Sequence, residues 1–93
     1  MPKIFTKQMS VEDAKDLGTD NWGYWDCEPA TFDWTYFEQE TAYILEGDVI
    51  VTSKYETVHI TENMLVSFPK GLTCTWEIRK TIKKKYIFNF PVE

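Results

Sequence analysis

The sequence is poor in cysteine, in basic residues and in long apolar runs. Its two cysteines, Cys27 and Cys74, are too few for a disulfide framework, so we expect two free thiols. Ten basic residues against fifteen acidic ones give a net charge of −5, which argues against nucleic acids and anionic membranes as partners. No apolar run approaches the roughly 20 residues that cross a bilayer. We therefore expect a soluble, cytoplasmic protein.

Aromatic residues are abundant instead. Four Trp, five Tyr and six Phe make up 16% of the 93 residues. The length predicts a single domain spanning residues 1–93. So short a chain buries only roughly 60–65% of its unfolded surface, so its core has to come from bulky side chains. This composition is typical of a small barrel filled with large residues.

One short helix is predicted near the amino terminus, over about residues 10–18. Ser10 is placed to cap its first turn, and Asp13 stands three residues later, as in a capping box. Val11, Ala14 and Leu17 fall on one face. Gly18 can end the helix in the left-handed conformation.

From about residue 21 to residue 91 the sequence predicts strands separated by turns. Apolar and polar residues alternate with period two, which favours an all-β sandwich or barrel. Turns are expected at 28–30, 47–48, 62–63 and 69–71. The expected strands are 21–27, 32–38, 41–45, 49–53, 55–60, 64–68, 72–78 and 82–90, the last with Tyr86, Phe88 and Phe90 on one face.

A basic cluster interrupts the alternation near the carboxyl end, formed by Arg79, Lys80, Lys83, Lys84 and Lys85. Such a cluster is typical of a solvated stretch beside an edge strand, where it opposes aggregation. The alternative is a local anion-binding site.

Two segments resemble the paired motifs of the cupin superfamily. The first cupin motif has two histidines one residue apart, then a glutamate and, after six residues, a glycine. Glu40 and Gly47 match it at the required spacing, while Trp34 and Tyr36 stand where the histidines would be.

The second cupin motif has a glycine, five residues, Pro-x-Gly, two residues and a histidine. Here Pro69 and Gly71 match, Asn63 replaces the first glycine and Cys74 replaces the histidine. Asn is a suitable replacement because it tolerates a positive φ. Within the superfamily, the segments 43–47 and 68–72 are similar to the cupin domain of ureidoglycine aminohydrolase, and the resemblance covers about residues 22–90.

The resemblance implies a small cupin jelly-roll β-barrel, and a homodimer because cupins commonly pair through edge strands. Metal-binding cupins hold a divalent ion with three imidazoles and one carboxylate. This chain has a single histidine, His59, which we expect to be a partly exposed strand residue outside any site. Glu40 and Cys74 alone are too few for a zinc site. We expect no metal and no cofactor. The alternative is a divalent metal that binds together with substrate or water ligands.

If the motif alignment holds, five side chains converge on the barrel interior: Trp34, Tyr36, Glu40, Cys74 and Trp76. They could line a pocket for a small, flat or sugar-like ligand, or the aromatic ones could fill the core. Cys74 is interpreted as a small buried residue, because a nucleophilic cysteine needs a base or a cation beside it.

Three functions follow, and the sequence leaves all three open. The first is a metal-free module that binds a small molecule. The second is an enzyme similar to ureidoglycine aminohydrolase that acts on a ureido, amide or amino-acid-like substrate, with Glu40 as acid or base and Tyr36 as an orienting donor. The third is an interaction protein with a filled barrel.

Overall fold

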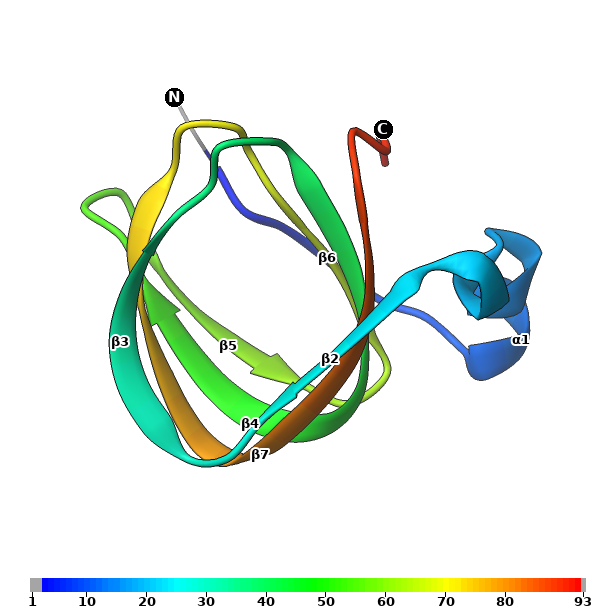
Figure 1. Cartoon of the computed structure of the whole chain (residues 1–93), viewed down its shortest axis with the longest axis horizontal. Helices are drawn as coiled ribbons and strands as arrows, with labels where there is room; N and C mark the ends of the chain where they lie inside the picture. Colours follow the sequence, from blue (N-terminus) through cyan, green and yellow to red (C-terminus); the bar gives the residue numbers. More distant parts are fainter. Residues whose placement is uncertain (1–2, 93) are drawn as a thin grey trace.

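Seven strands and one short α-helix make up the computed structural model, which describes residues 3–92 (Figure 1). The helix lies outside a strongly curved sheet. Among the described residues no helix is long and apolar enough to cross a membrane. The elements are β1 (Phe5–Gln8), α1 (Val11–Asp16), the 3₁₀ turn η1 (Thr19–Asn21), β2 (Gly23–Cys27), β3 (Ala30–Thr35), β4 (Glu40–Thr52), β5 (Thr57–Thr61), β6 (Met64–Phe68) and β7 (Thr73–Phe88).

The two longest strands, β4 and β7, run antiparallel through the middle of the sheet and belong to both of its layers. The first half of β4 pairs with β6 and with the second half of β7, and β1 and β2 flank them. The second half of β4 pairs with β5 and with the first half of β7, which also pairs with β3. The predicted all-β jelly-roll fold is confirmed, although the hydrogen-bonded sheet does not close on itself.

Gly47 does not form the predicted turn. It lies inside β4, where the register with β7 shifts between Ile44 and Val49. Its φ is +133°, and a Cβ atom there would lie 2.9 Å from the Cα of Ile82. The glycine therefore lets β4 bend and approach β7 while pairing continues. The predicted break between the strands 72–78 and 82–90 is also wrong. β7 is continuous through these residues because it stays paired with β4 where β4 bends.

The main core fills the space between the two layers. Val49, Val51, Ile60, Val66 and Phe68 are all fully buried there. Burying a side chain of this size contributes roughly 1.5–3 kcal/mol, and the alternation of inward and outward residues supplies one such side chain per two residues of strand. The predicted inward face of Leu72, Cys74, Trp76 and Ile78 is confirmed, since all four are buried.

A second cluster lies on the outer face of the sheet, under the helix. Ala14 of α1 packs there with Trp22, Tyr43 and Leu65. The backbone N–H of Asp13 donates to the Ser10 hydroxyl at 3.1 Å, and Gly18 has a φ of +96°, so both predicted ends of the helix are confirmed.

Two asparagines take left-handed conformations. Asn63 has a φ of +62°, which confirms its predicted role as a glycine substitute. Asn89 has a φ of +58° and ends β7, so Phe90 does not share a face with Tyr86 and Phe88 as predicted. Its ring instead packs edge-on against Trp22, 5.2 Å between centroids, in the outer cluster.

Candidate functional site

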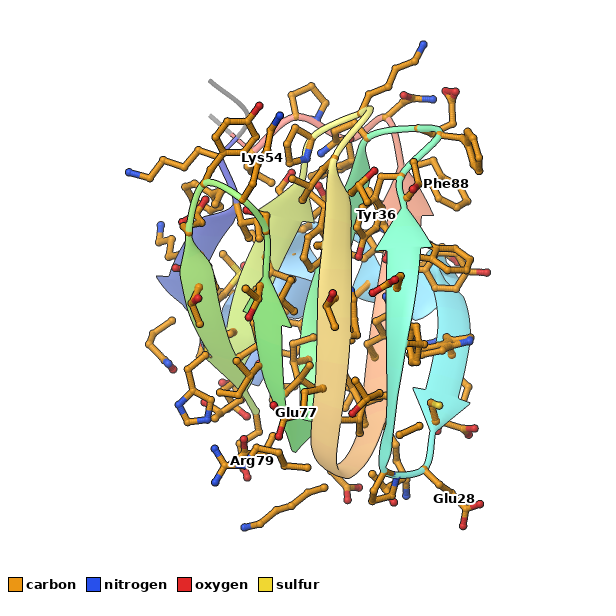
Figure 2. The ribbon with its side chains drawn as sticks, turned by 90° about the vertical axis from the view of Figure 1, so that its left-hand side faces the viewer. Glu28, Tyr36, Lys54, Glu77, Arg79 and Phe88 are labelled. Atoms are coloured by element: carbon orange, nitrogen blue, oxygen red, sulfur yellow. The ribbon has the colours of Figure 1, made fainter. Side chains whose placement is uncertain are left out.

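A cavity of about 250 Å³ opens between β2, β3 and β7. β2 and β3 both pair with β7 but not with each other, so no strand pairing closes the sheet between them on this side. Figure 2 places Tyr36 and Phe88 toward the same end of the molecule, with Glu28 and Arg79 at the opposite end. The lining consists of seven aromatic side chains and two charged ones: Trp25, Phe32, Trp34, Tyr36, Trp76, Tyr86, Phe88, Glu40 and Lys84.

Strand alternation explains why these side chains face inward. Trp76, Lys84, Tyr86 and Phe88 occupy even positions of β7, in phase with the buried Ile82. Trp34, on β3, is half exposed at the mouth, as is Phe88. The aromatic walls contact one another: the rings of Phe32 and Trp76 are nearly parallel with centroids 6.3 Å apart. Such contacts hold the rings in place around the cavity.

The two charged residues form a buried ion pair. The ammonium of Lys84 donates to Oε2 of Glu40 at 2.6 Å, and each side chain is only 8% exposed. The Lys84 Nζ atom also lies 5.0 Å from the ring centroids of Trp25 and Trp76, and 5.9 Å from that of Tyr86. Three ring faces and one carboxylate thus compensate the positive charge where water is scarce.

The ion pair still has a hydrogen-bond acceptor and hydrogen-bond donors available to a ligand in the cavity. Oε1 of Glu40 accepts no hydrogen bond from residues 3–92, yet no fully buried side-chain oxygen or nitrogen of that range lacks a partner. Oε1 is therefore reached by solvent. An ammonium has three N–H donors, and that of Lys84 donates only one hydrogen bond within the same range. The cavity floor therefore presents an acceptor beside a donor.

Tyr36 adds a second donor. The indole N–H of Trp76 donates to the Tyr36 hydroxyl oxygen at 3.2 Å, and within the described chain the phenol proton has no acceptor. Burial, together with the negative charge of Glu40, raises the pKa of Tyr36 well above its usual value. The phenol therefore stays protonated and able to donate into the cavity.

Of the five side chains expected in the pocket, Trp34, Tyr36, Glu40 and Trp76 line this cavity. Cys74 does not. It is buried in the core and borders a separate hollow near Thr52 and Gly71. Burial raises the pKa of its thiol to about 11, so the thiol is protonated at neutral pH and is a poor nucleophile.

His59 lies away from the cavity. Its ring is about half exposed on β5, and Nε2 lies 2.8 Å from the carboxylate of Asp48. This hydrogen bond is the main cause that lowers the pKa of Asp48.

Five lining residues escaped the sequence prediction: Trp25, Phe32, Lys84, Tyr86 and Phe88. The prediction of a solvated basic stretch beside an edge strand is wrong for Lys84, because β7 is a central strand and this side chain points inward. The sequence did contain a signal for this: Lys84 lies two residues from the apolar Ile82 and Tyr86, so strand alternation places it on the same inward face. The neighbouring Lys83 follows the expectation, being 42% exposed and 3.4 Å from Glu46.

The residues at the cupin metal-ligand positions do not fit a transition-metal ion. The carboxylate of Glu40 is already paired with an ammonium. Trp34 stands at a histidine position but has no lone pair to bind a metal, and the Cys74 thiol lies outside the cavity. Across residues 3–92 no three His, Cys, Asp or Glu side chains come together in a way that could hold a metal.

Comparisons with known proteins agree on the family. The EutQ-like cupin domain family matches residues 14–86. A DUF861 family protein from Thermotoga maritima is 37% identical, with a TM-score of 0.87 over 92% of this chain and 99% of that one. The EutQ protein of Clostridium difficile is 20% identical, with a TM-score of 0.65 over 94% of this chain and 68% of that one.

A putative ethanolamine utilization protein Q from Salmonella typhimurium is 19% identical, with a TM-score of 0.65 over 91% of this chain and 68% of that one. No curated protein matches the chain. These comparisons show the cupin family but not the finer resemblance to ureidoglycine aminohydrolase. The matched segment contains most of the barrel and all but one of the cavity-lining residues, and the chain belongs to the EutQ-like cupin domain family.

Proposed function

We propose that this chain binds a small, uncharged organic molecule with an amide-like head group in the aromatic-lined cavity. The observation that carries the proposal is the Glu40–Lys84 pair at the floor of an otherwise aromatic cavity. A cavity left open beside a buried ion pair counts against the alternative of a filled barrel.

The chemistry of the floor selects the head group. Glu40 offers a free carboxylate oxygen and Lys84 offers unused N–H donors, side by side. A matching ligand places an N–H donor next to a carbonyl acceptor, which is the arrangement in a carboxamide or a ureido group. A ligand with a net charge would have to oppose one member of the pair in a poorly hydrated site, which costs free energy.

The walls select the body of the ligand. Flat rings surround the floor on several sides, and aromatic walls favour a flat or apolar body that stacks on them. The volume of about 250 Å³ lies below the roughly 300–1,000 Å³ of pockets for drug-sized ligands. The proposed ligand is therefore a small metabolite.

A matched series of probes tests the head group: benzamide, benzoate and benzylammonium carry the same ring with neutral, negative and positive heads. Binding is read from the indole N–H signals in ¹⁵N-edited NMR spectra. Trp25, Trp34 and Trp76 line the cavity, whereas Trp22 lies in the outer cluster and serves as an internal control.

We expect benzamide to move the three cavity signals and leave that of Trp22 in place. Glu40→Gln should weaken benzamide binding by about tenfold, the loss of one charge-assisted hydrogen bond. Tighter binding of either charged probe, or shifts equal for Trp22 and the cavity indoles, would contradict the proposal. Native mass spectrometry of protein purified without chelators would identify a co-purified ligand, and it would also test the homodimer that the cupin resemblance implies.

A second candidate is an enzyme that acts on such an amide or ureido compound, as the resemblance to ureidoglycine aminohydrolase implies. The observation that favours it is the Tyr36 phenol, which accepts from Trp76 and keeps its own proton for a ligand. Glu40 would then move a proton while Tyr36 orients the substrate carbonyl. If turnover of a co-purified ligand is found, Glu40→Gln should abolish it, and an undiminished rate would exclude this mechanism.

A further inference from the structure

We infer that the Lys84 ammonium is the built-in cation of this cavity: it supplies to Glu40 the positive charge that a metal ion supplies in metal-binding cupins, and it excludes a divalent ion from the site. The inference concerns the charge of the cavity and stands whether or not an organic ligand binds there.

The register of the sheet shows how Lys84 reaches this position. Lys84 pairs with Ile44, whereas Glu40 pairs with Phe88, four residues further along the same two strands. Four residues of strand span about 13 Å. The two long side chains therefore extend toward each other along the inner wall and meet at 2.6 Å.

The surroundings then keep the ammonium in place. The indole rings of Trp25 and Trp76 each lie 5.0 Å from Nζ, and Lys84 as a residue is only 6% exposed. Turning the ammonium away would leave the Glu40 carboxylate buried without its counter-charge, which is strongly unfavourable. The carboxylate and the two indole rings together therefore hold the ammonium at the cavity floor.

Electrostatics also explains the exclusion. A divalent ion that bound Glu40 would lie within a few ångströms of the ammonium. Two positive charges so close together in a poorly hydrated site repel strongly, and the repulsion is twice as large when one of them is divalent. Restoring missing metal ligands without removing Lys84 should therefore not restore metal binding.

The experiment compares two variants titrated with Zn²⁺ and Ni²⁺ alone by isothermal calorimetry, after treatment with chelator. The first is Trp34→His/Tyr36→His, which adds two imidazoles to the carboxylate of Glu40. The second adds Lys84→Met, which keeps a long apolar side chain and removes the charge. We expect the second variant to bind metal at least about a hundredfold more tightly than the first.

A matched control adds Lys83→Met in place of Lys84→Met, because Lys83 is half exposed and paired with Glu46 on the other face of β7. This control should bind no more tightly than Trp34→His/Tyr36→His. Affinities within threefold of each other with and without Lys84 would overturn the inference.

A second measurement applies if the histidine variants do not fold. Urea unfolding is compared for Lys84→Met in the native background and in a Glu40→Gln background. If Lys84 acts as the cation for Glu40, its removal should lower the urea midpoint much less when the carboxylate is already neutral. An equal loss in both backgrounds would mean that Lys84 only fills space between the rings, and the inference would fail.

Discussion

The Nζ atom of Lys84 lies 2.6 Å from Oε2 of Glu40, although 44 residues separate them in the sequence. The pair joins the two central strands, β4 and β7, on the inside of the molecule. Because both charges are buried among aromatic rings, each depends on the other, and the cavity that they line carries no net charge. A site of this kind favours neutral, polar head groups over ions.

The space around the ammonium leads to a first prediction. Lys84→Arg keeps the positive charge but introduces a larger, planar group between rings whose centroids lie 5.0 Å from Nζ. Overpacking should lower the free energy of unfolding by about 1–3 kcal/mol. Lys83→Arg, on the exposed face, should change it by no more than about 0.5 kcal/mol. Equal midpoints for the two variants in urea unfolding would show that the space between the indole rings accommodates a guanidinium without overpacking.

Much of the fold could be predicted from the sequence because each signal was local. The helix is marked by residues at its own ends, Ser10 and Asp13 at the start and Gly18 after the last turn. Alternation over 72–78 identifies the inward face of β7, whichever strands it pairs with. β1 could not be found in this way, because its residues Phe5, Thr6, Lys7 and Gln8 do not alternate and the strand exists through its pairing with β6.

The candidate site divides in the same manner. The cupin motifs and strand alternation predict five neighbours, of which four line one cavity and Cys74 does not. Lys84 lies in a run of lysines, and the composition of that run hides its inward phase. Its partner is distant in the sequence, and only the pairing of β4 with β7 brings them together.

Gly47 leads to a second prediction. Gly47→Ala would place a Cβ 2.9 Å from the Cα of Ile82 at a φ of +133°, so the backbone would have to move where β4 bends. We expect a loss of about 3 kcal/mol or more in the free energy of unfolding, from the unfavourable φ and the contact together. Gly71→Ala is the control, because its φ is +89° but nothing lies within 4 Å of the added Cβ. It should cost about 1–2 kcal/mol, and an equal loss for both variants would show that the approach to Ile82 is unimportant.

The buried thiol of Cys74 predicts a loss of stability at alkaline pH. Burial raises its pKa from 9.0 to about 11. As the pH rises from 9 toward 11, the unfolded chain releases this proton while the folded chain retains it, so the free energy of unfolding falls. The fall should reach about 1.4 kcal/mol per pH unit, and the raised pKa of Tyr36 adds to it above pH 10.

Urea unfolding between pH 8 and pH 10.5 tests this dependence. Cys74→Ala should show a shallower fall than the native chain, after an initial cost of about 1 kcal/mol for the lost sulfur contact. Cys27→Ala is the control, since Cys27 is only partly buried, and it should keep the native slope. A native slope in Cys74→Ala would mean that the thiol does not titrate differently in the two states.

Gly23 and Tyr86 lead to the last prediction, because they are directly paired between β2 and β7. A Cβ at Gly23 would lie 2.8 Å from Cζ of the Tyr86 ring, so the absence of a side chain at Gly23 lets this ring lean over β2 and form one wall of the cavity. Gly23→Ala should displace the ring and lower the free energy of unfolding by about 1–2 kcal/mol. It should also move the indole N–H signals of Trp25 and Trp76, whose rings surround the same ammonium as Tyr86.

In a Tyr86→Ala background the same change should cost nothing, because no ring remains to be displaced, and alanine is itself better suited to a strand than glycine. An undiminished cost in that background would mean that Gly23 is required by the backbone of β2 and has no part in shaping the cavity.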